Sequence, residues 1–121
     1  MKTFTLDGPH PLTEQAISEL VPSDVVGAYV LGQVRSNQVF LTRRVGRAHQ
    51  NLRANLVNYI GAYESFQFTV CETPAVAFMA ECAFYHRFHP TDNPSHPERP
   101  ENLNIVCPFC GFGAANPDLI P

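Results

Sequence analysis

Glu81 stands in a stretch of sequence where a carboxylate is unusual. It is the single acidic residue of the segment 73–88, whose side chains are mostly those of Ala, Phe, Met and Val. Burying a carboxylate among such side chains is costly unless it is paired, coordinated or placed at the edge of a cleft. We therefore expect Glu81 to face a reactive cleft. The alternative is a buried ion pair with an arginine.

A second group of residues has the types and spacing of a metal site. Cys82 and His86 are four residues apart and fall on one face of a helix. Cys107 and Cys110 are separated by Pro and Phe, the spacing of a zinc knuckle. Together they predict a structural Cys₃His zinc site that would pin the C-terminal loop 94–113. Two alternatives are a redox dithiol, which the late position of the motif disfavours, and a pair of ordinary thiols.

The elements that must position these residues follow from hydrophobic periodicity. The segment 73–88 is predicted to be a helix, because Thr73 suits the N-cap and Pro74 the first helical position. Strands are expected at 24–32, 39–45 and 66–71, with a short strand at 2–6, and further helices at 11–20 and 48–63. The order predicts one α/β domain over residues 1–121. We expect a small, mainly antiparallel three-stranded sheet flanked by helices, with a zinc-stapled C-terminal loop.

Positive charge is concentrated in one part of a chain whose formal net charge is −3. Residues 25–63 contain no Asp or Glu and hold five of the eight basic residues, all of them arginines. This pattern favours an anion-binding surface over a merely solvated face, because the Arg fork suits phosphate. We expect nucleic-acid contacts from Arg35, Arg43, Arg44 and Arg47. Arg53 is the fifth arginine of the segment.

Several short motifs resemble, in order and spacing, those of the GIY-YIG nuclease domain. The first long strand carries Gly-Ala-Tyr at 27–29, and the second ends in Arg-Val-Gly at 44–46. The metal-binding Glu of the family corresponds to Glu81, and the family Asn that follows a proline corresponds to Asn93. The resemblance covers a core of about residues 25–93.

The C-terminal part is similar to a subset of these domains. Its motifs are Glu-Cys-x-x-x-His at 81–86, His-Pro-Glu-Arg-Pro at 96–100 and Cys-Pro-Phe-Cys at 107–110. Three positions differ from the family pattern: the Tyr of the second motif is Arg44, and the Arg and His of the following helix are Asn55 and Tyr59. These differences leave open an alternative function, a catalytically degenerate module that binds nucleic acid or another partner.

The resemblance implies metal-dependent hydrolysis of phosphodiesters, with DNA favoured over RNA. Glu81 would hold a catalytic Mg²⁺ or Mn²⁺, because these cations prefer oxygen ligands. The Tyr29 hydroxyl would orient the attacking water or take its proton. Arg47 or Arg53 would stabilise the charge that develops on the phosphate. Asn93 completes the implied catalytic set.

The sequence contains no pattern that predicts contact with a membrane. No run reaches the roughly 18 uncharged apolar residues that a membrane span needs. The first residues lack the apolar core of a signal peptide. We therefore expect a cytoplasmic protein, in which cysteines serve as thiols or metal ligands more often than as disulfides.

Overall fold

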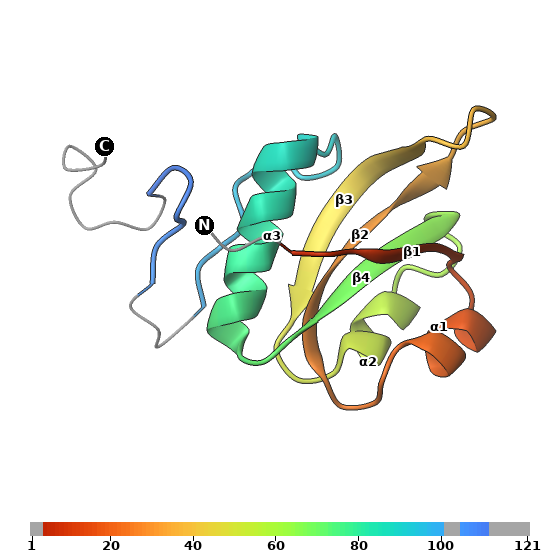
Figure 1. Ribbon diagram of the computed structural model, residues 1–121, viewed down its shortest axis with the longest axis horizontal. Helices are drawn as coiled ribbons and strands as arrows, with labels where there is room; N and C mark the ends of the chain where they lie inside the picture. The colour runs from red at the N-terminus through yellow and green to blue at the C-terminus, as the bar shows by residue number, and fades with distance from the viewer. Residues whose placement is uncertain (1–3, 101–104, 112–121) are drawn as a thin grey trace.

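The computed structural model describes residues 4–100 and 105–111. Within these residues the chain forms a four-stranded sheet and three helices, and all strand pairs are antiparallel (Figure 1). The strands lie in the order β1-β4-β2-β3. They are β1 (Asp7–Pro11), β2 (Val26–Val34), β3 (Phe40–Ala48) and β4 (Ser65–Cys71), and the helices are α1 (Glu14–Leu20), α2 (Leu52–Val57) and α3 (Pro74–Phe88).

Helices cover both faces of the sheet, so the core has two halves. In one half, α1 and α2 pack against the sheet, with Ile17 and Leu56 almost fully buried. In the other half, α3 packs on the opposite face through residues such as Phe84. Because side chains alternate along a strand, β2 contributes Leu31 to the first half and Val30 to the second.

The predicted helix around Glu81 is confirmed as α3. The Thr73 hydroxyl accepts a hydrogen bond from the Val76 backbone N–H at 3.2 Å, which satisfies one of the open donors of the first turn. The helix ends at His89, whose φ of +47° turns the chain away. In the described part of the chain, no helix is long and apolar enough to cross a bilayer.

The three-stranded sheet predicted from the sequence is wrong, because β1 adds a fourth strand. This strand lies at Asp7–Pro11 and not at 2–6, where residues 2 and 3 lie outside the described residues. Two prolines and a glycine weaken its strand pattern. They are tolerated because β1 is an edge strand that pairs only with β4, with a register irregularity between Asp7 and His10.

Two helices are shorter than their periodicity indicates. The helix α1 begins at Glu14, where Thr13 accepts a hydrogen bond from the Ala16 N–H and caps the first turn. The helix α2 spans only Leu52–Val57, although apolar spacing continues to Tyr63. Gly61 adopts a φ of +90°, so the later apolar residues lie on a turn that leads into β4.

Candidate functional site

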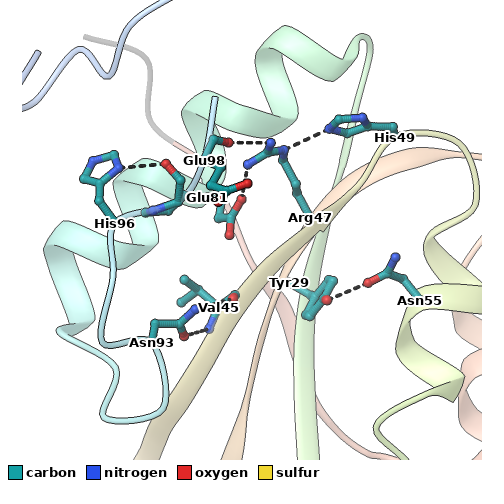
Figure 2. Close-up of polar contacts among 10 residues, drawn as sticks. Tyr29, Val45, Arg47, His49, Asn55, Glu81, Asn93, His96 and Glu98 are labelled. Atoms are coloured by element: carbon teal, nitrogen blue, oxygen red, sulfur yellow. Dashed lines mark hydrogen bonds and ion pairs between the residues drawn. The ribbon is translucent and has the colours of Figure 1, made fainter. Parts of the chain in front are cut away.

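A polar cleft of about 480 Å³ opens beside the edge strand β3. Four of the five residues predicted to be catalytic line this cleft, namely Tyr29, Arg47, Glu81 and Asn93. They come from β2, β3, α3 and the loop after α3. Figure 2 shows Tyr29 on the α2 side of β3, with Glu81 and Asn93 on the other side. Residues on both sides of the edge strand β3 therefore line the cleft.

Tyr29 crosses β3 at a position where only glycine leaves room. Tyr29 pairs with Gly46 in the β2–β3 register, and a Cβ on Gly46 would lie 2.4 Å from the tyrosine hydroxyl oxygen. The hydroxyl donates a hydrogen bond to Oδ1 of Asn55 on α2 at 2.6 Å. Burial raises the pKa of Tyr29, and Tyr59 raises it further. The side chain is therefore a protonated phenol that can orient a water molecule.

The Arg47 guanidinium is held from three directions. Nη1 donates to Oε1 of Glu81 at 2.6 Å, Nε donates to Nε2 of His49 at 2.9 Å, and Nη2 donates to the backbone oxygen of Glu98 at 2.5 Å. The guanidinium also lies 5.2 Å from the centre of the Phe78 ring. Arginine has five N–H donors. Two N–H groups therefore have no hydrogen bond to the described residues and can receive an oxyanion.

Glu81 forms an ion pair with Arg47, which was the alternative to a carboxylate that faces the cleft. It also lines the cleft. Its side chain is 9% exposed. Burial raises the pKa of Glu81, and the Arg47 guanidinium opposes part of that rise. Arg47 binds only Oε1, and Oε2 has no hydrogen bond to the described residues. One carboxylate oxygen thus remains for a cation or for water.

The Asn93 side chain forms hydrogen bonds with the outer edge of β3, as the backbone of a neighbouring strand would. Its Oδ1 accepts from the Val45 N–H at 2.8 Å, and its Nδ2 donates to the Val45 oxygen at 3.2 Å. The neighbouring Asp92 N–H donates to the Arg43 oxygen at 2.8 Å. Both polar atoms of the Asn93 amide are engaged, so this residue positions β3 rather than reacting groups.

Of the four arginines predicted to contact nucleic acid, two line the cleft. They are Arg47 and Arg44, whose Nε donates to the Tyr63 hydroxyl at 3.1 Å. Arg43 lines a neighbouring cavity of about 580 Å³, where its Nη2 lies 3.7 Å from Oδ1 of Asp92. Arg35 is exposed in the turn between β2 and β3. The four arginines therefore lie in three places: two in the cleft, one in the neighbouring cavity and one in the turn.

Arg53 does not belong to the cleft. Its Nε donates to the Val21 oxygen at 2.5 Å and its Nη2 to the Ser18 oxygen at 2.7 Å. These carbonyls end α1, and a helix end leaves such oxygens without intrahelical partners. Arg53 joins α2 to α1, which is a structural role, and its predicted role in catalysis has no geometric support.

A second candidate site lies where the loop after α3 returns to that helix. Its ligand atoms all lie within 4.8 Å of one another and come from His86, His96, Cys107 and Cys110. This group could bind a metal ion. The predicted ligand Cys82 is not part of it and His96 takes its place. Cys82 is fully buried in a cluster with Phe78 and Cys107, where its thiol contacts the Cys107 thiol but does not converge with the other three ligand atoms.

Hydrogen bonds arrange this group for metal binding. Nδ1 of His96 lies 2.9 Å from the Pro97 oxygen, and a carbonyl can only accept, so Nδ1 carries the proton. The lone pair of His96 Nε2 then faces Nε2 of His86 at 3.2 Å. Burial lowers the pKa of His86, with His96 and His89 adding to the effect, and this favours the neutral ring that binds metals. The Phe109 N–H lies 3.4 Å from Cys107 Sγ, as in a knuckle turn.

Three residues of these sites were not assigned a role from the sequence. His96 belongs to a quoted motif, but only the return of the loop to α3 reveals its contact with His86. Asn55 was noted as a departure from the family pattern, and it anchors Tyr29. His49 gave no signal, because its contact with Arg47 depends on how the chain leaves β3.

Comparison with known proteins assigns no family to the chain. No protein-family model, curated protein or solved structure matches it. What each site can do follows from its own side chains. The cleft offers a buried carboxylate, an anchored arginine and a phenol, and the second group offers two imidazoles and two thiols.

Proposed function

We propose that the chain is a metal-dependent phosphodiesterase of GIY-YIG type that cleaves DNA, and less favourably RNA, in the cleft beside β3. The observation that carries the proposal is the meeting of Tyr29, Arg47 and Glu81 in one cleft. These residues lie on three different elements, so their meeting there depends on the tertiary fold. A phenol that orients water, a guanidinium that stabilises charge and a carboxylate that holds a cation can together support in-line hydrolysis of a phosphodiester.

Each side chain has a part in the proposed reaction. Oε2 of Glu81 would bind Mg²⁺ or Mn²⁺, and the bound cation supplies neutralisation of the phosphoryl oxygens and the leaving group. The two remaining N–H groups of Arg47 would hold a phosphate oxygen. The Tyr29 hydroxyl donates its proton to Asn55, so its oxygen would orient the attacking water by accepting a hydrogen bond from it. Asn93 would keep β3, and with it Arg47, in register.

Tyr29→Phe is expected to lower the rate of DNA cleavage by at least about tenfold and to change thermal stability little. The ring keeps its place against Gly46, and only the bond to Asn55 is lost, which costs about 1 kcal/mol. Single-turnover cleavage with Mg²⁺ or Mn²⁺ and a melting curve measure the two effects. An unchanged rate would remove the hydroxyl from the mechanism.

A binding module without catalysis is the second candidate, and one observation favours it. Glu81 is already paired with Arg47 at 2.6 Å, so both groups have a structural use that needs no cation. Asn55, at the position of the family Arg, is likewise occupied by Tyr29. In this alternative Arg44 and Arg47 would bind the phosphates of a nucleic acid that is never cleaved.

Both candidates predict salt-dependent binding of DNA through the cleft. Arg44→Ala is expected to weaken binding about tenfold and to reduce the salt slope by about one, because one phosphate contact is lost. Arg35→Ala is the matched control, since Arg35 is exposed in the hairpin turn and does not line the cleft. Fluorescence anisotropy with duplex DNA at several salt concentrations measures both. Equal effects of the two variants would argue against binding in the cleft.

For the second site we propose a structural Zn²⁺ held by His86, His96, Cys107 and Cys110. In a tetrahedral zinc site, two nitrogen ligands lie about 3.3 Å apart and nitrogen and sulfur ligands about 3.5 Å apart. The distances here are 3.2 Å between the imidazole nitrogens and 3.5 Å between Cys107 Sγ and His86 Nε2. Four protein ligands leave no open position, which suits a structural ion. Neither cysteine forms a disulfide within the described residues, which suits a protein of the cytoplasm.

A further inference from the structure

A short segment links the two sites directly. His96 contributes Nε2 to the metal-binding group, and two residues later the Glu98 oxygen accepts a hydrogen bond from Nη2 of Arg47. Figure 2 shows the Glu98 backbone oxygen and the Glu81 carboxylate at the Arg47 guanidinium, with His96 on the same side of Arg47. We call residues 96–98 the strap.

The strap is stiff enough that the position of His96 determines the position of the Glu98 oxygen. Pro97 is buried, and its ring restricts φ between the imidazole ligand and the carbonyl that holds Arg47. The Pro97 oxygen also accepts from Nδ1 of His96 at 2.9 Å, which fixes the imidazole relative to the strap backbone. The place of the Glu98 oxygen therefore follows closely from the place of His96.

The contacts around Arg47 connect α3 and the strap in a ring of interactions. One link of this ring is missing. The helix α3 supplies Glu81 to the guanidinium and His86 to the metal-binding group. The strap supplies the Glu98 oxygen to the same guanidinium and His96 to the same group. A metal ion that binds His86 and His96 joins the strap to α3 and closes the ring.

We propose that metal binding at the His/Cys group positions Arg47 in the cleft through the strap. With the ring closed, three N–H groups of Arg47 are anchored, and the remaining two belong to a guanidinium that is already held in place before an oxyanion binds. Without the metal, only the contact between the two imidazoles ties the strap to α3, and the Nη2 anchor of the guanidinium loosens. This inference rests on the metal site proposed above, and it holds whether or not the cleft cleaves DNA.

The test uses the Nε–H signal of Arg47 in the NMR spectrum of the full chain, identified by its loss in Arg47→Lys. Arg53 is an internal reference, because its guanidinium is held by the carbonyls of Ser18 and Val21. Insertion of two glycines between Pro97 and Glu98 keeps all four metal ligands and loosens the strap. We expect Arg47 Nε–H to exchange with water at least about tenfold faster in this variant, with Arg53 unchanged. Zinc content should stay at that of the wild type.

The control is the same insertion between residues 36 and 37, in the exposed turn between β2 and β3. It should alter neither signal. Removing the metal from the wild-type protein with a chelator should accelerate exchange at Arg47 and leave Arg53 protected. If the Arg47 Nε–H in the strap variant exchanged at the wild-type rate, the proposal would be overturned. Simultaneous loss of the Arg47 and Arg53 signals on chelation would overturn it as well. A wild-type protein without bound metal would overturn both this inference and the proposed metal site, whereas absent cleavage alone would affect neither.

Discussion

Glu81→Gln is expected to lower Mg²⁺- or Mn²⁺-dependent cleavage by at least about a hundredfold. Gln has nearly the shape of Glu, so the packing of this α3 side chain is retained. Its amide oxygen can still accept from Nη1 of Arg47, but the neutral group binds a divalent cation poorly. The substitution therefore removes the proposed cation ligand while changing little else in the cleft.

The same substitution is also expected to lower thermal stability, because the Arg47–Glu81 pair is largely buried. The exposed fractions of the two side chains are 13% and 9%, and replacing one charge of such a pair costs on the order of 2 kcal/mol. A melting curve alone thus cannot distinguish a cation ligand from an ion-pair partner. The cleavage assay must be compared with a variant of similar stability.

Ile17→Val provides that comparison. Ile17 is 1% exposed in the half of the core on the α1 side, and loss of one methylene there costs about 1 kcal/mol. At a temperature where both variants remain folded, Ile17→Val should cleave at the wild-type rate. If both variants lost activity in proportion to their stability, Glu81 would be a structural residue only.

His96→Ala is expected to weaken zinc binding at least about a hundredfold, and at saturating zinc this corresponds to about 3 kcal/mol of lost stabilisation. The reason is that His96 supplies one of four convergent ligand atoms. Removing it leaves an incomplete tetrahedron, and the strap loses its tie to α3. Zinc per chain, from elemental analysis, and the melting temperature measure the effect.

Cys82→Ala is the matched control, because the sequence motif and the geometry disagree about this residue. Cys82 is fully buried beside Phe78 and is not among the convergent ligands, so its truncation should leave zinc content unchanged. Loss of zinc in Cys82→Ala with retention in His96→Ala would reverse the ligand assignment. The pair thus tests the ligand set at the one position where the two predictions differ.

The sequence predicts α3 and its carboxylate well, because the information is local. Thr73 and Pro74 mark the start of the helix, and a lone acid among apolar residues indicates a cleft or an ion pair. The hairpin that carries Tyr29 was also predicted, but its second strand was expected to end at 45, whereas β3 continues to Ala48 and pairs Gly46 with Tyr29. The cleft wall on α3 and the hairpin strands could therefore be anticipated in part, and the contact between Tyr29 and Gly46 could not.

Contacts made by loops could not be predicted in the same way. His96 becomes a ligand only because the proline-rich loop returns to α3, and its distance from His86 depends on the whole path of that loop. The contacts of Arg53 with the carbonyls at the end of α1 likewise depend on how α2 packs beside α1, which no local pattern indicates. The strand β1 was missed since its pairing with β4 overrides a weak local preference.

We propose that Glu81 takes part in catalysis in the cleft and does not only stabilise the fold. The most direct test is the initial rate at which wild-type and Glu81→Gln protein nick supercoiled plasmid with Mn²⁺, each assayed below its melting temperature and with its zinc content measured. We predict metal-dependent nicking by the wild type that stops with chelator and is at least about a hundredfold slower in the variant. Equal rates, or no nicking of any DNA or RNA form by the zinc-loaded wild type, would contradict the account and leave the binding module in its place.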